Sequence, residues 1–95
     1  MRVRFSDDFD KQKSVRTKQE RGIDFIEIRM IWNDPDSVDE NARNTTDEER
    51  KFTVGKIGEK LWVAIWTYRN RDEIRIISVR RAEGTNFERT YYESK

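Results

Sequence analysis

Five arginines lie between residues 69 and 81, and arginine is the side chain best suited to holding phosphate. They are Arg69, Arg71, Arg75, Arg80 and Arg81. A guanidinium group stays charged at neutral pH and presents forked N–H donors that match phosphate oxygens. Residues 50–95 carry 11 basic and 6 acidic side chains, a net charge of +5, although the whole chain has only +1. This pattern indicates an anionic partner; the alternative is a charge-rich surface that faces solvent.

Any proton transfer must use side chains other than histidine and cysteine, because the chain contains neither. Their absence excludes histidine-based triads, thiolate nucleophiles, disulfides and the common zinc sites. We expect no metal and no cofactor. Carboxylates, lysines and tyrosines remain as candidates. Lys13 and Glu20 lie seven residues apart and would share one face of a helix, with Arg21 next to Glu20.

The composition describes one small domain that spans residues 1–95. Hydrophobic residues make up 34% and charged residues 41% of the 95 positions. Ile and Val dominate the aliphatic residues, which favours strands in the core. No apolar run is long enough to cross a membrane and no signal peptide is recognisable, so we expect a cytoplasmic protein.

The first half of the chain predicts two helices. Residues 2–5 alternate as a short strand would, and residues 10–21 predict an exposed helix that Gly22 ends. A second helix is expected from residue 24, because Asp24 and Glu27 have the spacing of a capping box, and Pro35 ends it. Residues 36–50 are acidic and without periodicity, which predicts a loop.

The second half predicts an antiparallel meander with strands at 52–57, 61–68 and 74–80. Trp62 and Trp66 lie in a strand so apolar that we expect them in the core rather than on a base-stacking surface. Alternation along the third strand would place Arg75 and Arg81 on one face and Arg80 on the other. A capping box at residues 85–88 predicts a last helix. The fold class is therefore α+β, with N-terminal helices, a three- to four-stranded antiparallel sheet and a short C-terminal helix.

The third strand and the residues after it carry a resemblance to a known family. The segments are Glu73-Ile-Arg-Ile-Ile-Ser-Val-Arg-Arg-Ala82 and Glu88-Arg-Thr-Tyr-Tyr-Glu93, with Gly22-Ile-Asp-Phe25 and Trp32-Asn-Asp-Pro35 upstream. Together they resemble the signature of the BrnT toxin family. The resemblance implies a small ribonuclease with a RelE-like fold, acting as the toxin of a type II toxin–antitoxin system. It also implies a BrnA-like antitoxin that silences the toxin, and contact with operator DNA only through that antitoxin.

The resemblance implies roles for the candidate residues in RNA cleavage. Arg75 and Arg80 would stabilise charge on the reacting phosphate, and Glu20 or Tyr92 would move the proton. Tyr92 could instead stack on a base. The RNA-binding residues would be Lys13, Arg21, Arg69, Arg71 and Arg81.

One local difference from the family motivates other hypotheses. Glu20-Arg21 stands where the family commonly has Lys-His. The chain could therefore be a catalytically inactive relative that still binds the antitoxin, or a small RNA-binding module without catalysis.

Overall fold

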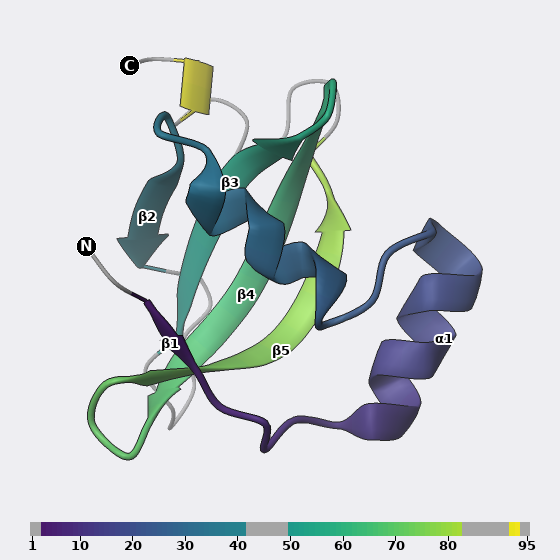
Figure 1. Ribbon diagram of the computed structural model, residues 1–95, viewed down its shortest axis with the longest axis vertical. Coiled ribbons are helices and arrows are strands. Elements are labelled where there is room, and N and C mark those ends of the chain that lie inside the picture. The colour runs from purple at the N-terminus through teal and green to yellow at the C-terminus, as the bar shows by residue number, and fades with distance from the viewer. Residues whose placement is uncertain (1–2, 42–49, 83–91, 94–95) are drawn as a thin grey trace.

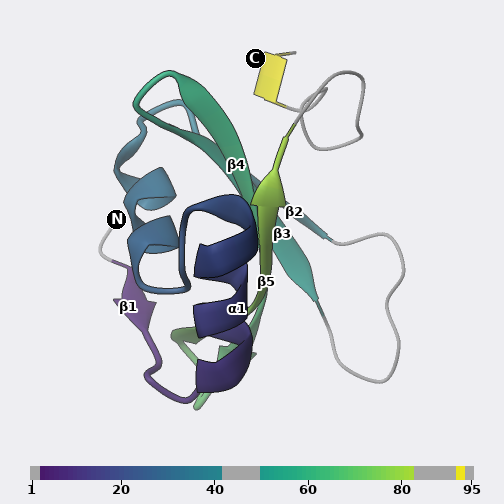
Figure 2. The same ribbon diagram turned by 90° about the vertical axis from the view of Figure 1, so that its right-hand side faces the viewer.

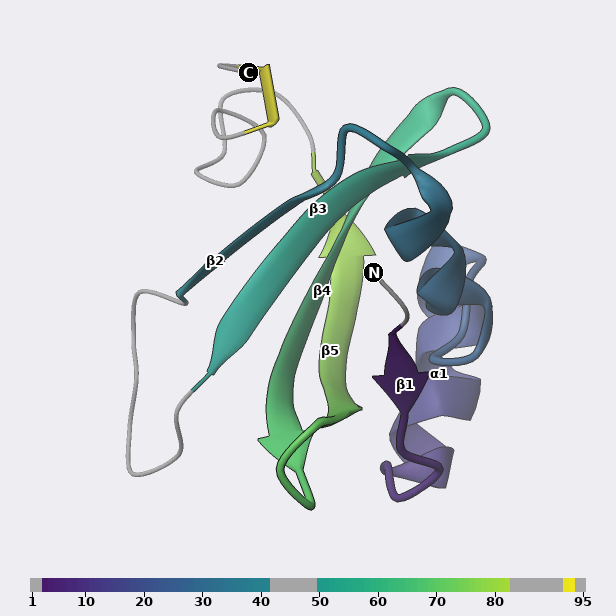
Figure 3. The ribbon, with the colours of Figure 1, turned by 60° about the vertical axis from the view of Figure 1, so that its left-hand side comes forward.

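A five-stranded sheet organises the computed structural model, which describes residues 3–41, 50–82 and 92–93. The strands are β1 (Arg4–Phe5), β2 (Val38–Asn41), β3 (Lys51–Ile57), β4 (Lys60–Arg69) and β5 (Glu73–Arg81). The strands are labelled in Figure 1, and their order across the sheet is β1-β5-β4-β3-β2. The strands β1 and β2 therefore form opposite edges, as Figure 3 shows. The α+β class is confirmed, but the expectation of three to four antiparallel strands is wrong. The strand β1 pairs parallel with β5, and β2 forms inside the segment expected to be a loop.

The helix α1 (Lys11–Arg21) has the caps that its sequence predicts. The side chain of Asp10 accepts a hydrogen bond from the Lys13 N–H at 3.0 Å, which satisfies a free donor of the first turn. Gly22 adopts a left-handed backbone with φ of 89°, and its N–H donates to the Lys18 carbonyl at 2.9 Å. The prediction of a helix over 10–21 is confirmed.

The second helical element, η1 (Glu27–Asn33), is a 3₁₀ helix. The predicted capping box is present, because Asp24 Oδ1 accepts from the Glu27 N–H and Glu27 Oε1 accepts from the Asp24 N–H. Phe25, Ile28 and Ile31 are completely buried. Their spacing of three matches the 3.0 residues per turn of a 3₁₀ helix, which stacks all three along one line towards the sheet.

The two faces of the sheet carry separate apolar clusters. On the helix face, which α1 and η1 cover (Figure 2), β4 contributes Trp62, Ala64 and Trp66. On the second face, it contributes Leu61 and Val63, with Ile65 packed against them. The prediction that Trp62 and Trp66 belong to the core is confirmed, since they are only 7% and 2% exposed.

A β-bulge changes which arginines share a face. Ile65 pairs with Ser78 but the next residue of β4, Trp66, pairs with Ile76, so Ile77 is an extra residue in β5. Arg75 lies opposite Thr67 and Arg80 lies opposite Val63, both at odd-numbered positions of β4. Arg75 and Arg80 therefore share the second face. The expectation that strict alternation separates them is wrong.

The expected C-terminal helix begins at residues 85–88, which lie outside the described residues. Tyr92, within the described pair 92–93, packs against the second-face cluster.

No helix among the described residues is long and apolar enough to cross a membrane.

The close approach of η1 to β3 requires glycine at position 55. A Cβ atom on Gly55 would lie 2.7 Å from the Ile31 carbonyl oxygen and 3.1 Å from the Ile31 Cβ. Gly55→Ala should therefore lower the free energy of unfolding by about 2–3 kcal/mol, because it forces η1 away from the sheet. Urea unfolding followed by tryptophan fluorescence measures this loss.

Gly58→Ala is the matched control for that substitution. Gly58 has φ of 64° but open space around its missing Cβ, so only backbone strain of about 1 kcal/mol is expected. Equal losses for the two variants would contradict the argument from close packing.

Candidate functional site

Arg75 is held in place by the loop between β1 and α1. Its Nε donates to the Asp8 carbonyl oxygen at 2.9 Å. The Asp8 carboxylate forms an ion pair with Arg69 at 2.8 Å, and the Asp8 N–H donates to Ser6 Oγ. The structure shows no other partner for the Arg75 side chain within residues 3–41, 50–82 and 92–93. Its two terminal nitrogens therefore remain available for a bidentate contact with an anion.

Arg69, Arg75 and Arg80 form an arginine row on the second face. Arg75 and Arg80 are five positions apart in β5, which corresponds to roughly 15 Å along a strand. The row is therefore long enough to contact more than one phosphate of an extended chain. Arg71 lies in the β4–β5 turn, where Asn70 and Arg71 both have positive φ values of 52° and 79°.

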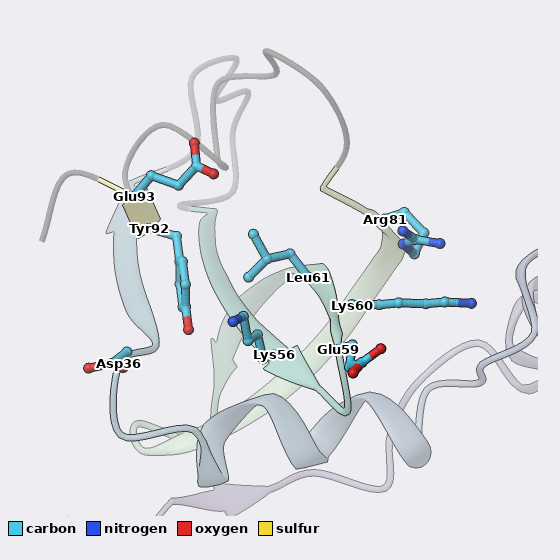
Figure 4. Close-up of a pocket in the computed structure, with 8 residues that line it drawn as sticks. All are labelled: Asp36, Lys56, Glu59, Lys60, Leu61, Arg81, Tyr92 and Glu93. Carbon is cyan, nitrogen blue, oxygen red and sulfur yellow. The ribbon is translucent and has the colours of Figure 1, made fainter.

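Arg81 lies apart from this row. Its guanidinium carbon is 5.5 Å from the centre of the Trp62 ring, on the helix face. Arg81 also lines a pocket of about 660 Å³ at the end of the sheet where β5 ends and β3 turns into β4 (Figure 4). The residues that line this end pocket are Asp36, Lys56, Glu59, Lys60, Leu61, Arg81, Tyr92 and Glu93. The structure thus brings together two of the predicted site residues, Arg81 and Tyr92.

The Tyr92 hydroxyl is engaged by a carboxylate. It donates to Asp34 Oδ2 at 2.9 Å, and the same oxygen accepts from the Lys56 N–H at 2.8 Å. Burial and the hydrogen bond to negatively charged Asp34 raise the pKa of Tyr92 to about 12. Tyr92 is therefore protonated at neutral pH, with its proton directed at Asp34 rather than at a leaving group. This geometry fits a fixed aromatic ring better than a general acid.

The pKa of Asp34 shifts in the opposite direction from that of Tyr92. Burial alone would raise the pKa of Asp34, but hydrogen bonds from the N–H groups of Lys56 and Asp36 and from Tyr92 outweigh it. The charge of Lys56 acts in the same sense, so the pKa of Asp34 is lowered. The ionised carboxylate is the form that the fold stabilises.

The predicted residues of α1 follow the loop that holds Arg75, but the structure shows no hydrogen bond or ion pair that joins them to the arginine row among the described residues. Lys13 is half-buried, and Glu20 and Arg21 are exposed at the C-terminal end of the helix. α1 packs beside β5 on the helix face (Figure 2). The structure does not place these three residues next to Arg75 or Arg80, and their roles stay predictions.

The residues of these two regions that sequence reasoning missed include Asp8, Asp34, Lys56 and Lys60. Asp8 lies 67 positions from Arg75, and no local pattern links them. Asp34 precedes a proline and was interpreted only as a helix end. The lysines flank the Gly58 turn, a position typical of solvent-exposed charges.

The family model for the ribonuclease toxin BrnT of type II toxin–antitoxin systems matches residues 9–86. Among solved structures, the 1.1 Å crystal structure of the Brucella abortus ribonuclease toxin BrnT is similar, with a TM-score of 0.59 and 16% sequence identity. The likeness covers 87% of this chain and 100% of that chain, and at this identity it concerns the fold alone. No match is found among curated protein sequences. The RelE-like detail of the fold stays a prediction.

The pairing of Tyr92 with Asp34 has a measurable pH dependence. Because the pKa of Tyr92 is higher in the folded chain than its ordinary value of about 10, its contribution to stability is complete below pH 10. That contribution is lost as the pH rises from 10 to about 12. Tyr92→Phe should lower the free energy of unfolding by about 1 kcal/mol at pH 7 and make its decline above pH 10 shallower.

Urea unfolding at pH 7, 10 and 11.5 tests this expectation. Tyr68→Phe is the control, because Tyr68 is 52% exposed and its hydroxyl has no partner within the described residues. If both variants followed the wild-type pH profile, the Tyr92–Asp34 hydrogen bond would not contribute to stability.

Proposed function

The chain belongs to the BrnT family of ribonuclease toxins of type II toxin–antitoxin systems, and we propose that it is a metal-independent endoribonuclease that inhibits translation. It would act in the cytoplasm, where its RNA substrate lies. A BrnA-like antitoxin would bind and silence it, and operator DNA would be contacted only through that antitoxin.

The observation that carries this proposal is the way in which the Arg75 guanidinium is held. Its Nε is fixed by the Asp8 carbonyl, while its two terminal nitrogens are left for an anion. A fixed guanidinium loses little conformational freedom when a phosphate arrives, so more of the binding energy is available to the transition state. Arg69 and Arg80 extend the same surface along the backbone of the RNA.

Cleavage would proceed by attack of the ribose 2′-oxygen on the adjacent phosphorus. The new P–O2′ bond forms as the P–O5′ bond breaks, which leaves a 2′,3′-cyclic phosphate and a free 5′-hydroxyl. Arg75 and Arg80 would stabilise the extra negative charge on the phosphorane oxygens. Glu20 stays the predicted group that takes the proton of the 2′-hydroxyl, and a proton from water would go to the leaving 5′-oxygen. Lys13, Arg21, Arg71 and Arg81 stay predicted contacts to RNA.

Cleavage of a defined RNA in EDTA tests the proposal, and Arg75→Ala tests the site. We expect fragments with 2′,3′-cyclic phosphate ends from the wild type. Arg75→Ala should lower the cleavage rate by about 10²–10³-fold, as expected for the loss of one charged donor to the transition state. Arg75→Lys should recover only part of the rate, because lysine lacks the forked geometry.

Arg16→Ala is the matched control, since Arg16 is an exposed arginine of α1 outside both candidate regions. Circular dichroism should show that each variant is folded. Equal cleavage by the wild type and Arg75→Ala would remove Arg75 from the site. Intact RNA with the folded wild type, together with harmless expression in cells, would favour the inactive antitoxin-binding relative.

A further inference from the structure

We infer that the end pocket binds one nucleotide of a single-stranded RNA, with the base beside Tyr92 and the phosphate near Lys60 and Arg81. The inference rests on the proposed function, because it assigns a second contact region to the same substrate. The pocket volume of about 660 Å³ lies within the range of roughly 300–1,000 Å³ that small ligands occupy. It is formed at the opposite end of β5 from Arg75, so it would recognise a nucleotide away from the cleaved bond.

The charged side chains of the pocket are distributed unevenly between its two ends, and this distribution suits the two ends of a nucleotide. The pocket lining contains three cations and three carboxylates, so net charge alone would not attract an anion. In Figure 4, Asp36, Tyr92 and Glu93 lie on one side of the hollow, with Lys56 next to Tyr92. Two carboxylates and one lysine leave a net negative charge on that side. Lys60 and Arg81 lie on the other side. Glu59 stands beside Lys60, which leaves a net positive charge at that end. A ligand with a neutral hydrogen-bond donor at one end and an anion at the other fits this arrangement.

Tyr92 supplies a fixed stacking surface for the base. Its hydroxyl is anchored on Asp34 at 2.9 Å, and its ring packs against the apolar cluster that includes Leu61. A ring that is already held in place pays little entropy when a base stacks on it, and such stacking contributes about 1–3 kcal/mol per base. Leu61 adds an apolar surface to the same hollow.

The carboxylates beside Tyr92 select the kind of base. The carboxylate oxygens of Asp36 and Glu93 accept hydrogen bonds. Cytosine, adenine and guanine each carry an exocyclic amino group that donates, whereas the corresponding position of uracil is a carbonyl that accepts. The pocket therefore favours bases with an amino group and disfavours uracil.

At the other end, the phosphate would meet Lys60 and Arg81. The Arg81 guanidinium lies over the Trp62 ring, 5.5 Å from its centre, and this cation–π contact restrains it. Lys60 begins β4 and is exposed. A ligand at Arg81 would also change the environment of Trp62, so tryptophan fluorescence can report binding.

Titration of the whole protein with nucleoside monophosphates tests the inference, and cytidine and uridine 5′-monophosphate form a matched pair of ligands. We expect cytidine monophosphate to bind at least fivefold more tightly than uridine monophosphate. It should also bind at least fivefold more tightly than cytidine, which lacks the phosphate. Isothermal titration calorimetry and tryptophan fluorescence measure both ratios.

Four variants separate the contacts. Asp36→Asn should abolish the preference for cytosine, while its backbone N–H still donates to Asp34. Lys60→Ala should abolish the advantage of the phosphate. Tyr92→Leu should weaken every nucleotide at least fivefold, and Tyr92→Phe, which keeps the ring, should weaken them less. Arg16→Ala should bind as the wild type does.

The outcomes distinguish this inference from the proposed function. Equal binding of all ligands, or ratios unchanged in Asp36→Asn and Lys60→Ala, would overturn the inference even if RNA is cleaved. Selective nucleotide binding that survives in Arg75→Ala would support it even if no RNA is cleaved. If Arg75→Ala changed both ratios as strongly as Lys60→Ala does, the nucleotide would bind at the arginine row and the end pocket would not be its site.

Discussion

The hydrogen bonds to the Asp34 carboxylate are the interactions on which the arrangement of the chain depends most. Its Oδ2 accepts from the Lys56 N–H of β3 and from the Tyr92 hydroxyl, and its Oδ1 accepts from the Asp36 N–H. Its own N–H donates to the Ile31 carbonyl at the end of η1. One side chain thus connects η1, the turn before β2, the end of β3 and the C-terminal segment. Because these hydrogen bonds are charge-assisted, they are stronger than ordinary ones and fix the relative positions of the segments.

Those features of the fold that depend on local chemistry could be predicted from the sequence. The caps of α1 and the reciprocal hydrogen bonds of Asp24 and Glu27 follow from residues three positions apart or adjacent to the helix end. The 3₁₀ winding of η1 could not be predicted in this way, because the sheet selects it by burying Phe25, Ile28 and Ile31 in one line. The parallel pairing of β1 with β5 joins segments about 70 residues apart, and only tertiary structure brings them together.

The candidate site shows the same division between residue type and placement. Arginine density indicated a phosphate-binding region, and the resemblance to the BrnT family selected Arg75 and Arg80 within it; the family match agrees with a ribonuclease. Their shared face depends on Ile77, an aliphatic residue whose sequence gives no sign of a bulge. Asp8, which holds Arg69 and Arg75, lies in a different part of the chain. Side-chain chemistry was therefore readable from the sequence, whereas the partners that orient it come from long-range contacts.

The bulge at Ile77 has a consequence for how this protein can evolve. Exchange of Ile77 for another aliphatic residue alters a partly buried side chain and leaves the strand in register. Loss of the residue altogether would restore strict alternation and transfer either Arg75 or Arg80, with every side chain on its half of β5, to the opposite face. Natural variants should therefore tolerate many amino acids at this position but no change in the number of residues. For keeping Arg75 and Arg80 on one face, the number of residues in β5 therefore matters more than the identity of the side chain at position 77.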